Sequence, residues 1–114
     1  MNRWTGVGRL GQQVELRYTP KGRPVARVLL AVDRVPVNGQ RGADWVRLVL
    51  WGRQAEVCSQ YAGKGSLVAV EGRLSSEWYE REGRKELATE VVVERLDFLA
   101  LRPANGNGSG EAKR

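Results

Sequence analysis

Residues 44–65 read DWVRLVLWGRQAEVCSQYAGKG, in which a strand-like half is followed by a helix-like half. Successive side chains of a β-strand point to opposite faces, so the first half divides into two sets. Val46, Leu48 and Leu50 form the predicted core face. The opposite face carries Trp45, Arg47, Val49 and Trp51. Two flat aromatic rings on either side of a cation can stack bases and hold a phosphate, although this strand taken alone favours tryptophans buried in a core or a subunit contact.

The second half of this stretch predicts a short helix. Gly52 breaks the alternation, and Arg53–Ala62 then reads as a helix of about two to three turns. The glycines in Gly63-Lys64-Gly65 end it, as glycines after a helix commonly do. The positions expected to face inward are Ala55, Cys58 and, as a third candidate, Tyr61.

Strand patterns fill most of the remaining chain. The other predicted strands are Arg3–Leu10, Val14–Tyr18, Val25–Arg34, Leu67–Leu74 with a continuation at Glu77–Tyr79, and Leu87–Leu101. Turn-forming residues separate several of them, at Thr19–Gly22, Asn38-Gly39 and Glu82–Arg84. One helix in an otherwise all-β chain of this length favours a small closed barrel, because closure removes exposed sheet edges.

The order of these elements predicts an all-β fold class. It is a five-stranded OB-fold barrel with one short helix between the third and fourth strands. The alternative is an SH3-like barrel, which usually lacks that helix. The chain of 114 residues suits one domain with a single core. We assign residues 1–102 to this domain, and we expect residues 103–114, rich in Gly and Asn, to form a disordered tail.

The charge of the chain predicts a polyanionic partner. The net charge is +6, and the pI is near 10.1. Residues 1–76 carry 12 Lys and Arg against 5 Asp and Glu, whereas residues 77–102 carry 5 against 7. An anion-binding surface should therefore draw on the first two-thirds of the chain, and its partner is usually a nucleic acid and sometimes a membrane surface.

The absence of histidine and the single cysteine, Cys58, exclude several kinds of chemistry. An intrachain disulfide is impossible, which fits a reducing cytoplasm. Zinc sites built from Cys and His, and Ser-His-Asp or Cys-His catalytic sets, are excluded as well. Glu56, Glu71 and Glu90 are read as surface or ion-pairing groups, because nothing supplies a nucleophile or a metal partner. No apolar run is long enough to span a bilayer. We expect no catalytic residue, no metal and no cofactor.

Several short segments carry a family resemblance. They are Val7-Gly8-Arg9-Leu10, Glu15-Leu16-Arg17-Tyr18-Thr19-Pro20, Trp51-Gly52, Lys64-Gly65-Ser66-Leu67-Val68, Glu71-Gly72-Arg73-Leu74 and Thr89-Glu90-Val91-Val92-Val93. In this order and spacing, from about residue 2 to residue 101, the chain resembles the bacterial single-stranded DNA-binding protein family. No single segment is decisive, but the ordered set is highly specific.

The resemblance implies an OB-fold that binds single-stranded DNA with little sequence preference, in replication, recombination, repair or DNA uptake. It also implies a homotetramer in the cytoplasm, associated with the nucleoid. The family's stacking aromatics fall on Trp45, Trp51 and Tyr79, and Arg47 lies between the first two. Its phosphate-contacting positions fall on Arg3, Arg53, Lys64 and Arg73. The alternatives are a primosome-type OB module that acts mainly through protein partners and an RNA-binding OB domain.

The chain departs from the family pattern at several places, one of which is Val35-Pro36-Val37, where some members have a further stacking aromatic. The tail lacks the acidic tip that recruits replication proteins, so recruitment through such a tip is not expected. Trp4 stands where aliphatic residues are usual, and we favour packing at a subunit contact over stacking for it. Glu77 and Glu80 flank Tyr79 and should weaken the attraction for phosphate there. The remaining basic residues are read as solvated: Arg17, Arg23 and Arg41.

Overall fold

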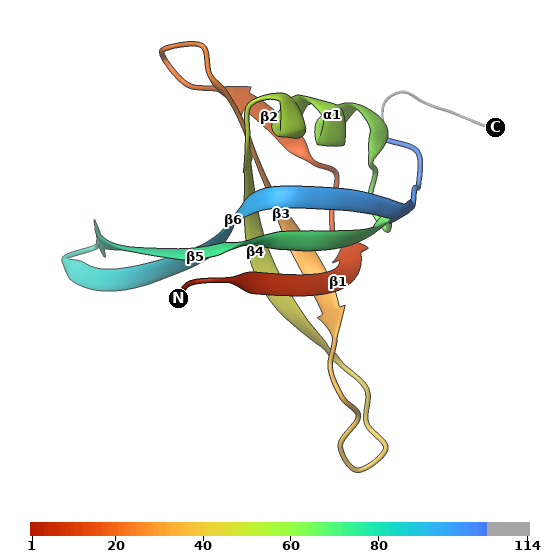
Figure 1. Ribbon diagram of the computed structural model, residues 1–114. Coiled ribbons are helices and arrows are strands. Elements are labelled where there is room, and N and C mark those ends of the chain that lie inside the picture. The colour runs from red at the N-terminus through yellow and green to blue at the C-terminus, as the bar shows by residue number, and fades with distance from the viewer. Residues whose placement is uncertain (105–114) are drawn as a thin grey trace.

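The computed structural model describes residues 1–104, which form six strands and one helix (Figure 1). The elements are β1 (Trp4–Leu10), β2 (Glu15–Tyr18), β3 (Pro24–Asp33), β4 (Ala43–Trp51), α1 (Arg53–Tyr61), β5 (Leu67–Arg81) and β6 (Arg84–Ala100). The long strands are β1, β3, β4, β5 and β6, so α1 lies between the third and fourth of them. The predicted fold class is confirmed. An SH3-like barrel does not account for this helix.

The sheet closes into a barrel. Its strands lie in the order β1-β5-β6-β4-β3-β2, and an additional pairing joins β1 to β3. That pairing places Arg9 opposite Ala31 and Leu10 opposite Leu30. β4 and β6 run parallel, whereas the other neighbouring strands are antiparallel. The short β2 extends the sheet beside β3 without taking part in the closure.

Inward side chains of the barrel strands form a single core. They include Leu10, Val28, Leu30, Leu48, Leu50, Val68, Val70 and Val91, each at most 4% exposed. The predicted core face of β4 is therefore confirmed at Leu48 and Leu50. The helix α1 contributes Ala55 and Cys58 to the same core. These apolar side chains fill the interior of the barrel, where the closed sheet shields them from water.

The helix corrects one expected inward position. Tyr61 is 54% exposed, whereas Ala62 is fully buried. The N–H group of Ala62 donates a hydrogen bond to the carbonyl oxygen of Cys58. Residues four apart lie on the same side of a helix, so Ala62 follows Cys58 into the core and Tyr61 points away.

The strands β5 and β6 extend beyond the barrel as a two-stranded arm (Figure 1). The turn at its tip contains Glu82 and Gly83, with φ angles of 52° and 77°. Positive φ at both central residues characterises the type I′ turn of tight hairpins. β5 is continuous from Leu67 to Arg81, without the interruption expected after Leu74. Leu74, expected on the core face with Val68, is 45% exposed because it lies where the arm begins.

The described chain ends against the barrel. The N–H group of Gly63 donates a hydrogen bond to the carbonyl oxygen of Arg102 at 2.9 Å. The carbonyl of Pro103 lies so close to Gly63 that a Cβ there would approach within 1.9 Å of its oxygen. Of the tail expected to be disordered, residues 105–114 lie outside the described residues. Among residues 1–104, no helix combines the length and apolar character needed to cross a membrane.

Candidate nucleic-acid interface

The outer face of β4 presents two tryptophans and an arginine. Trp45 is 60% exposed, Arg47 is exposed and Trp51 is partly buried. The ring of Trp45 lies over Gly11, where a Cβ would approach within 2.5 Å of the indole. Because Gly11 has no side chain, the indole can approach the chain between β1 and β2 closely. The ring is thereby held in one place with much of its surface open to solvent.

Trp51 carries a stacked cation that the sequence did not reveal. The guanidinium of Arg23 lies over the indole, 4.4 Å from the ring centroid. The backbone of Arg23 is fixed on both sides, because it exchanges hydrogen bonds with Thr19 across the β2–β3 turn. The sequence predicts only a solvated side chain for Arg23. Val25 is the register partner of Trp51, and Arg23 lies two residues before Val25. Side chains two residues apart in a strand share a face, and this alternation was the signal that could have placed Arg23 beside Trp51.

A row of registered residues runs around the outside of the barrel. Arg73 on β5 lies opposite Val92 on β6, which lies opposite Val49 on β4. Val49 in turn lies opposite Arg27 on β3. Val49 was placed on the open face of β4, yet it is only 2% exposed. Its face is as predicted, but neighbours from β3 and β6 cover it.

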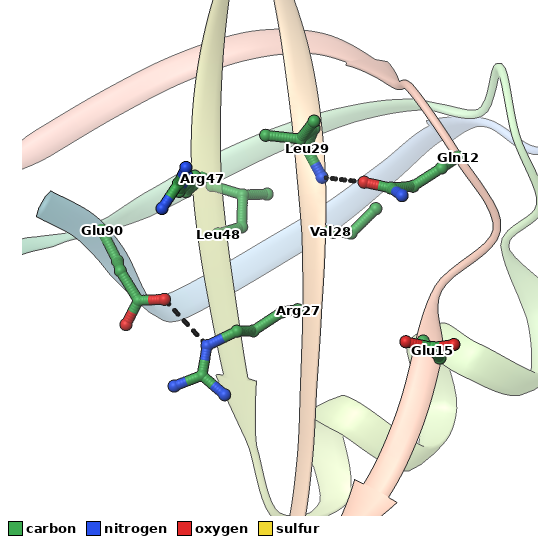
Figure 2. Close-up of a pocket in the computed structure, with 8 residues that line it drawn as sticks. All are labelled: Gln12, Glu15, Arg27, Val28, Leu29, Arg47, Leu48 and Glu90. Atoms are coloured by element: carbon green, nitrogen blue, oxygen red, sulfur yellow. Dashed lines mark hydrogen bonds and ion pairs between the residues drawn. The ribbon is translucent and has the colours of Figure 1, made fainter. Parts of the chain in front are cut away.

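A groove of about 380 Å³ lies on this outer face (Figure 2). It is lined by Gln12, Glu15, Arg27, Val28, Leu29, Arg47, Leu48 and Glu90. The Nε of Arg27 donates a hydrogen bond to Glu90 Oε2 at 2.8 Å. The backbone N–H of Leu29 donates to Gln12 Oε1 at 3.1 Å, which ties the β1–β2 connection to β3. The groove therefore holds charges of both signs beside Arg47.

The basic residues predicted to contact phosphate differ in their partners. Within residues 1–104, the side chains of Arg47, Arg53 and Lys64 form no ion pair or hydrogen bond, and all three are exposed. Arg3 lies 3.6 Å from Glu71, and Arg73 lies 3.6 Å from Glu94. Ion pairs this exposed contribute little to stability and can exchange for a phosphate. The predicted role of Glu71 and Glu90 as ion-pairing groups is confirmed.

The predicted residues do not all lie together. Trp45, Arg47 and Trp51 share the outer face of β4. Arg53 begins α1, two residues after Trp51. Arg73 lies two strands away on β5, in the same row as Val92 of β6 and Val49 of β4. Lys64 lies beyond the far end of α1, a helix of nine residues and so about 13 Å long. Arg3 precedes β1, which only β3 separates from β4 on the shorter way round the closed barrel. Its neighbour Trp4 lines a hollow together with Trp45 and Arg47.

Tyr79 lies out along the arm. Its side chain is 42% exposed, and its hydroxyl donates a hydrogen bond to Glu86 Oε1 at 2.8 Å. Alternation along β5 puts Tyr79 on the same sheet face as Arg73. Trp78, on the opposite face, is 68% exposed. On the face of Tyr79, the carboxylates of Glu77 and Glu86 are balanced by Arg81 and its register partner Arg84. Glu80 lies on the opposite face with Trp78.

Trp4 packs against the core of its own barrel, and the subunit contact that the sequence favours for it stays a prediction. It is partly buried against the core, and its ring lies over Gly6, where a Cβ would approach within 2.4 Å of the indole. Burial raises the pKa of Cys58 from 9.0 to about 11, so its thiol stays protonated near neutral pH. Within residues 1–104, no three His, Cys, Asp or Glu side chains are grouped so as to hold a metal ion.

A closed barrel with exposed aromatic rings and cations on one outer face defines a class of protein. It is an OB-fold with the kind of surface that binds single-stranded nucleic acids. Residues 1–99 match the family model described as the single-strand binding protein family, and the chain belongs to this family.

Curated relatives agree with the family assignment. The chain is 47% identical over 113 residues to single-stranded DNA-binding protein A of Bacillus subtilis (strain 168), covering 96% of this chain and 64% of that protein. It is 45% identical over 111 residues to single-stranded DNA-binding protein 1 of Staphylococcus aureus (strain COL), covering 95% and 66%. It is 40% identical over 110 residues to single-stranded DNA-binding protein 3 of Clostridium acetobutylicum, covering 94% and 76%. The chain thus spans about two thirds of the length of these relatives.

Proposed function

We propose that this protein binds single-stranded DNA with little sequence preference, without catalysing a reaction. The observation that carries the proposal is the outer face of β4, where Trp45 and Trp51 flank Arg47 beside a groove. The family of the chain and the names of its relatives support DNA as the ligand. Residues 1–102 are the proposed binding domain.

The mechanism combines stacking with charge neutralisation. Bases stack on Trp45 and Trp51, and each stack contributes on the order of 1–3 kcal/mol. Every base has a flat face, so stacking tolerates any sequence. Arg47 and Arg53 neutralise phosphates beside the two rings. The peripheral contacts in this proposal are Arg3, Lys64, Arg73 and Tyr79.

Tryptophan fluorescence tests the function directly. Titration with oligo-dT should quench the emission, because stacked bases quench indole, whereas a matched duplex should bind far more weakly. Raising the salt concentration should weaken binding with a slope of about −0.7 in log K per log salt for each phosphate neutralised. Unchanged emission at low salt, or equal binding of the duplex, would refute the proposal. Competition between matched DNA and RNA oligomers decides the RNA-binding alternative.

We also propose self-association as a homotetramer. Leu74, Trp78 and Leu87 are exposed on one face of the β5–β6 arm, where Trp78 and Leu87 are register partners. Apolar surface of this kind is commonly covered by a subunit contact. Light scattering should give about four times the chain mass of 12.7 kDa. A mass of one chain at micromolar concentration would contradict the tetramer. The proposed setting is the nucleoid in the cytoplasm, during replication, recombination, repair or DNA uptake.

A further inference from the structure

An ion pair crosses the strand that carries the proposed stacking residues. Arg27 belongs to β3 and Glu90 to β6, and β4 lies between these two strands in the sheet. A hydrogen-bonded distance of 2.8 Å between the two side chains requires them to meet above the outer face of β4. Figure 2 shows the two side chains reaching toward each other across this face, with Arg47 nearby.

The position of this ion pair along β4 follows from the register. Arg27 lies opposite Val49, and Leu29 lies opposite Arg47. Glu90 precedes Val91, the register partner of Leu48 on the parallel strand β4, so it lies level with Arg47. The pair therefore crosses β4 between the levels of Arg47 and Val49, within the stretch bounded by Trp45 and Trp51. The 2% exposure of Val49 fits this cover. A nucleic-acid strand that stacks on both tryptophans must pass over the Arg27–Glu90 pair.

The charges facing this path oppose one another. Arg27 is 61% exposed and its partner Glu90 only 25%. Arg47 and Glu15 also line the groove, and Glu15 lies 3.2 Å from Arg17. A phosphate on the path is attracted by Arg27 and repelled by the carboxylate of Glu90, which already neutralises Arg27 in the free protein. At the centre of its path, the nucleic-acid strand therefore meets an arginine, Arg27, whose charge is already neutralised by Glu90.

We propose that Arg27 is a phosphate-binding residue and that Glu90 limits the affinity by holding it. As the strand crosses β4, a phosphate replaces the Glu90 carboxylate on the Arg27 guanidinium. No covalent bond changes; one ion pair is exchanged for another. This inference rests on the proposed function, since it assigns the central phosphate contact of the same surface.

A double-mutant cycle on oligo-dT binding tests the exchange, with wild type, Glu90→Gln, Arg27→Gln and the double variant measured at several salt concentrations. Glu90→Gln should bind about fivefold more tightly at low salt, the factor expected for one charge repulsion at contact distance in water. Arg27→Gln should make the salt slope shallower by about 0.7, the value for one phosphate no longer neutralised. Arg27→Gln should bind more weakly than wild type, and it should abolish most of the gain from Glu90→Gln.

Asp97→Asn is the matched control. Asp97 is also on β6 and also pairs with an arginine, Arg95, at 3.3 Å. It lines a different hollow, beside Thr5 and Val7. The substitution changes the net charge by the same amount, so an affinity within twofold of wild type would show that the effect of Glu90→Gln is local.

The outcomes separate the two proposals. If wild type binds oligo-dT but Glu90→Gln binds no better, or the gain survives intact in the Arg27→Gln background, the exchange is wrong while the function stands. If wild type itself does not bind, the proposed function fails and the exchange fails with it. Circular dichroism of each variant reports folding. Should Glu90→Gln not fold, unchanged affinity of Arg27→Gln alone would still overturn the assignment.

Discussion

At the scale of single residues, Trp51 is held differently from Trp45. Trp45 rests on a glycine and leaves a wide surface open, whereas the indole of Trp51 is partly buried under the Arg23 guanidinium. A cation over an aromatic face contributes about 0.5–1 kcal/mol at an exposed site. That contact orients the indole before any base arrives. An incoming base must use the open part of Trp51 or displace Arg23.

Trp51→Ala tests the stacking assignment. Loss of one stack of about 1–3 kcal/mol should weaken oligo-dT binding about 5- to 150-fold. The domain should stay folded, because the indole lies outside the core. Fluorescence anisotropy of a labelled oligonucleotide measures the affinity without relying on tryptophan emission. Tyr61→Ala, an exposed aromatic on α1, is the control and should stay within twofold of wild type. Equal affinity of Trp51→Ala and wild type would show that bases do not stack there.

The buried thiol of Cys58 predicts a loss of stability at alkaline pH. Its pKa is raised to about 11 in the folded protein, above the ordinary value of 9.0. Between these pH values the unfolded chain releases the proton and the folded chain keeps it. The stabilising contribution is therefore complete below pH 9 and is lost as the pH rises toward 11, by on the order of 2–3 kcal/mol.

Urea unfolding of wild type and Cys58→Ala at pH 8 and pH 11 measures this contribution. Other groups also titrate over this range, so the informative quantity is the difference between the two proteins. Relative to wild type, Cys58→Ala should have a higher free energy of unfolding at pH 11 than it has at pH 8. Parallel changes in both proteins would mean that Cys58 ionises as easily when folded as when unfolded.

At the scale of elements, the β5–β6 arm has a weak point at its tip. Glu82 adopts a φ of 52°, a left-handed conformation that glutamate disfavours and asparagine tolerates better. The equivalent turn between β3 and β4 uses Asn38 and Gly39, with φ angles of 54° and 75°. One hairpin thus has the preferred pair of residues and the other does not. The β5–β6 turn forms because the paired strands on either side impose it.

Glu82→Asn should stabilise the arm locally, by about 0.5–1 kcal/mol. Hydrogen exchange of the amides between Tyr79 and Glu86 should slow by about two- to fivefold, while amides in the barrel core should be unaffected. Gly83→Ala should have the opposite effect, since its φ is 77°. Faster exchange in Glu82→Asn would show that the glutamate side chain supports the turn.

At the scale of the whole molecule, the barrel depends on close approach between neighbouring strands at two glycines. A Cβ on Gly8 would lie 2.3 Å from the carbonyl oxygen of Ala31 on β3. A Cβ on Gly72 would lie 2.2 Å from the carbonyl oxygen of Val92 on β6. Backbone cannot move aside as a side chain can. Gly8 therefore allows β1 to meet β3 where the barrel closes, and Gly72 allows β5 to lie close against β6.

Gly8→Ala should destabilise the whole barrel, because it forces β1 away from β3 at the closing pair. We expect a cost of roughly 2–3 kcal/mol, as for an overpacked core. Gly6→Ala is the matched control on the same strand. Its Cβ would meet the far end of the Trp4 indole, which can shift, so its cost should be smaller. Thermal unfolding at one protein concentration compares them. An equal or larger cost for Gly6→Ala would mean that the β1–β3 contact is not the limiting one.

The sequence was sufficient for much of the architecture and for part of the site. Alternation along residues 44–51 placed Leu48 and Leu50 in the core and left Trp45 and Arg47 exposed, because strand geometry fixes which side chains share a face. The same rule could not show that Val49 is covered. Nor could it show that Leu74 is half exposed, because that depends on where β5 leaves the barrel.

The sequence by itself determined the order of strands and helix, the excess of positive charge and the face of β4 that carries the aromatic rings. These follow from local periodicity and composition. Only the tertiary structure decided that Arg23 stacks on Trp51 and that Arg27 reaches Glu90, 63 residues away in the chain. Such contacts depend on which strands become neighbours when the barrel closes. Local periodicity does not indicate that pairing, so it cannot show that residues far apart in the chain lie close together.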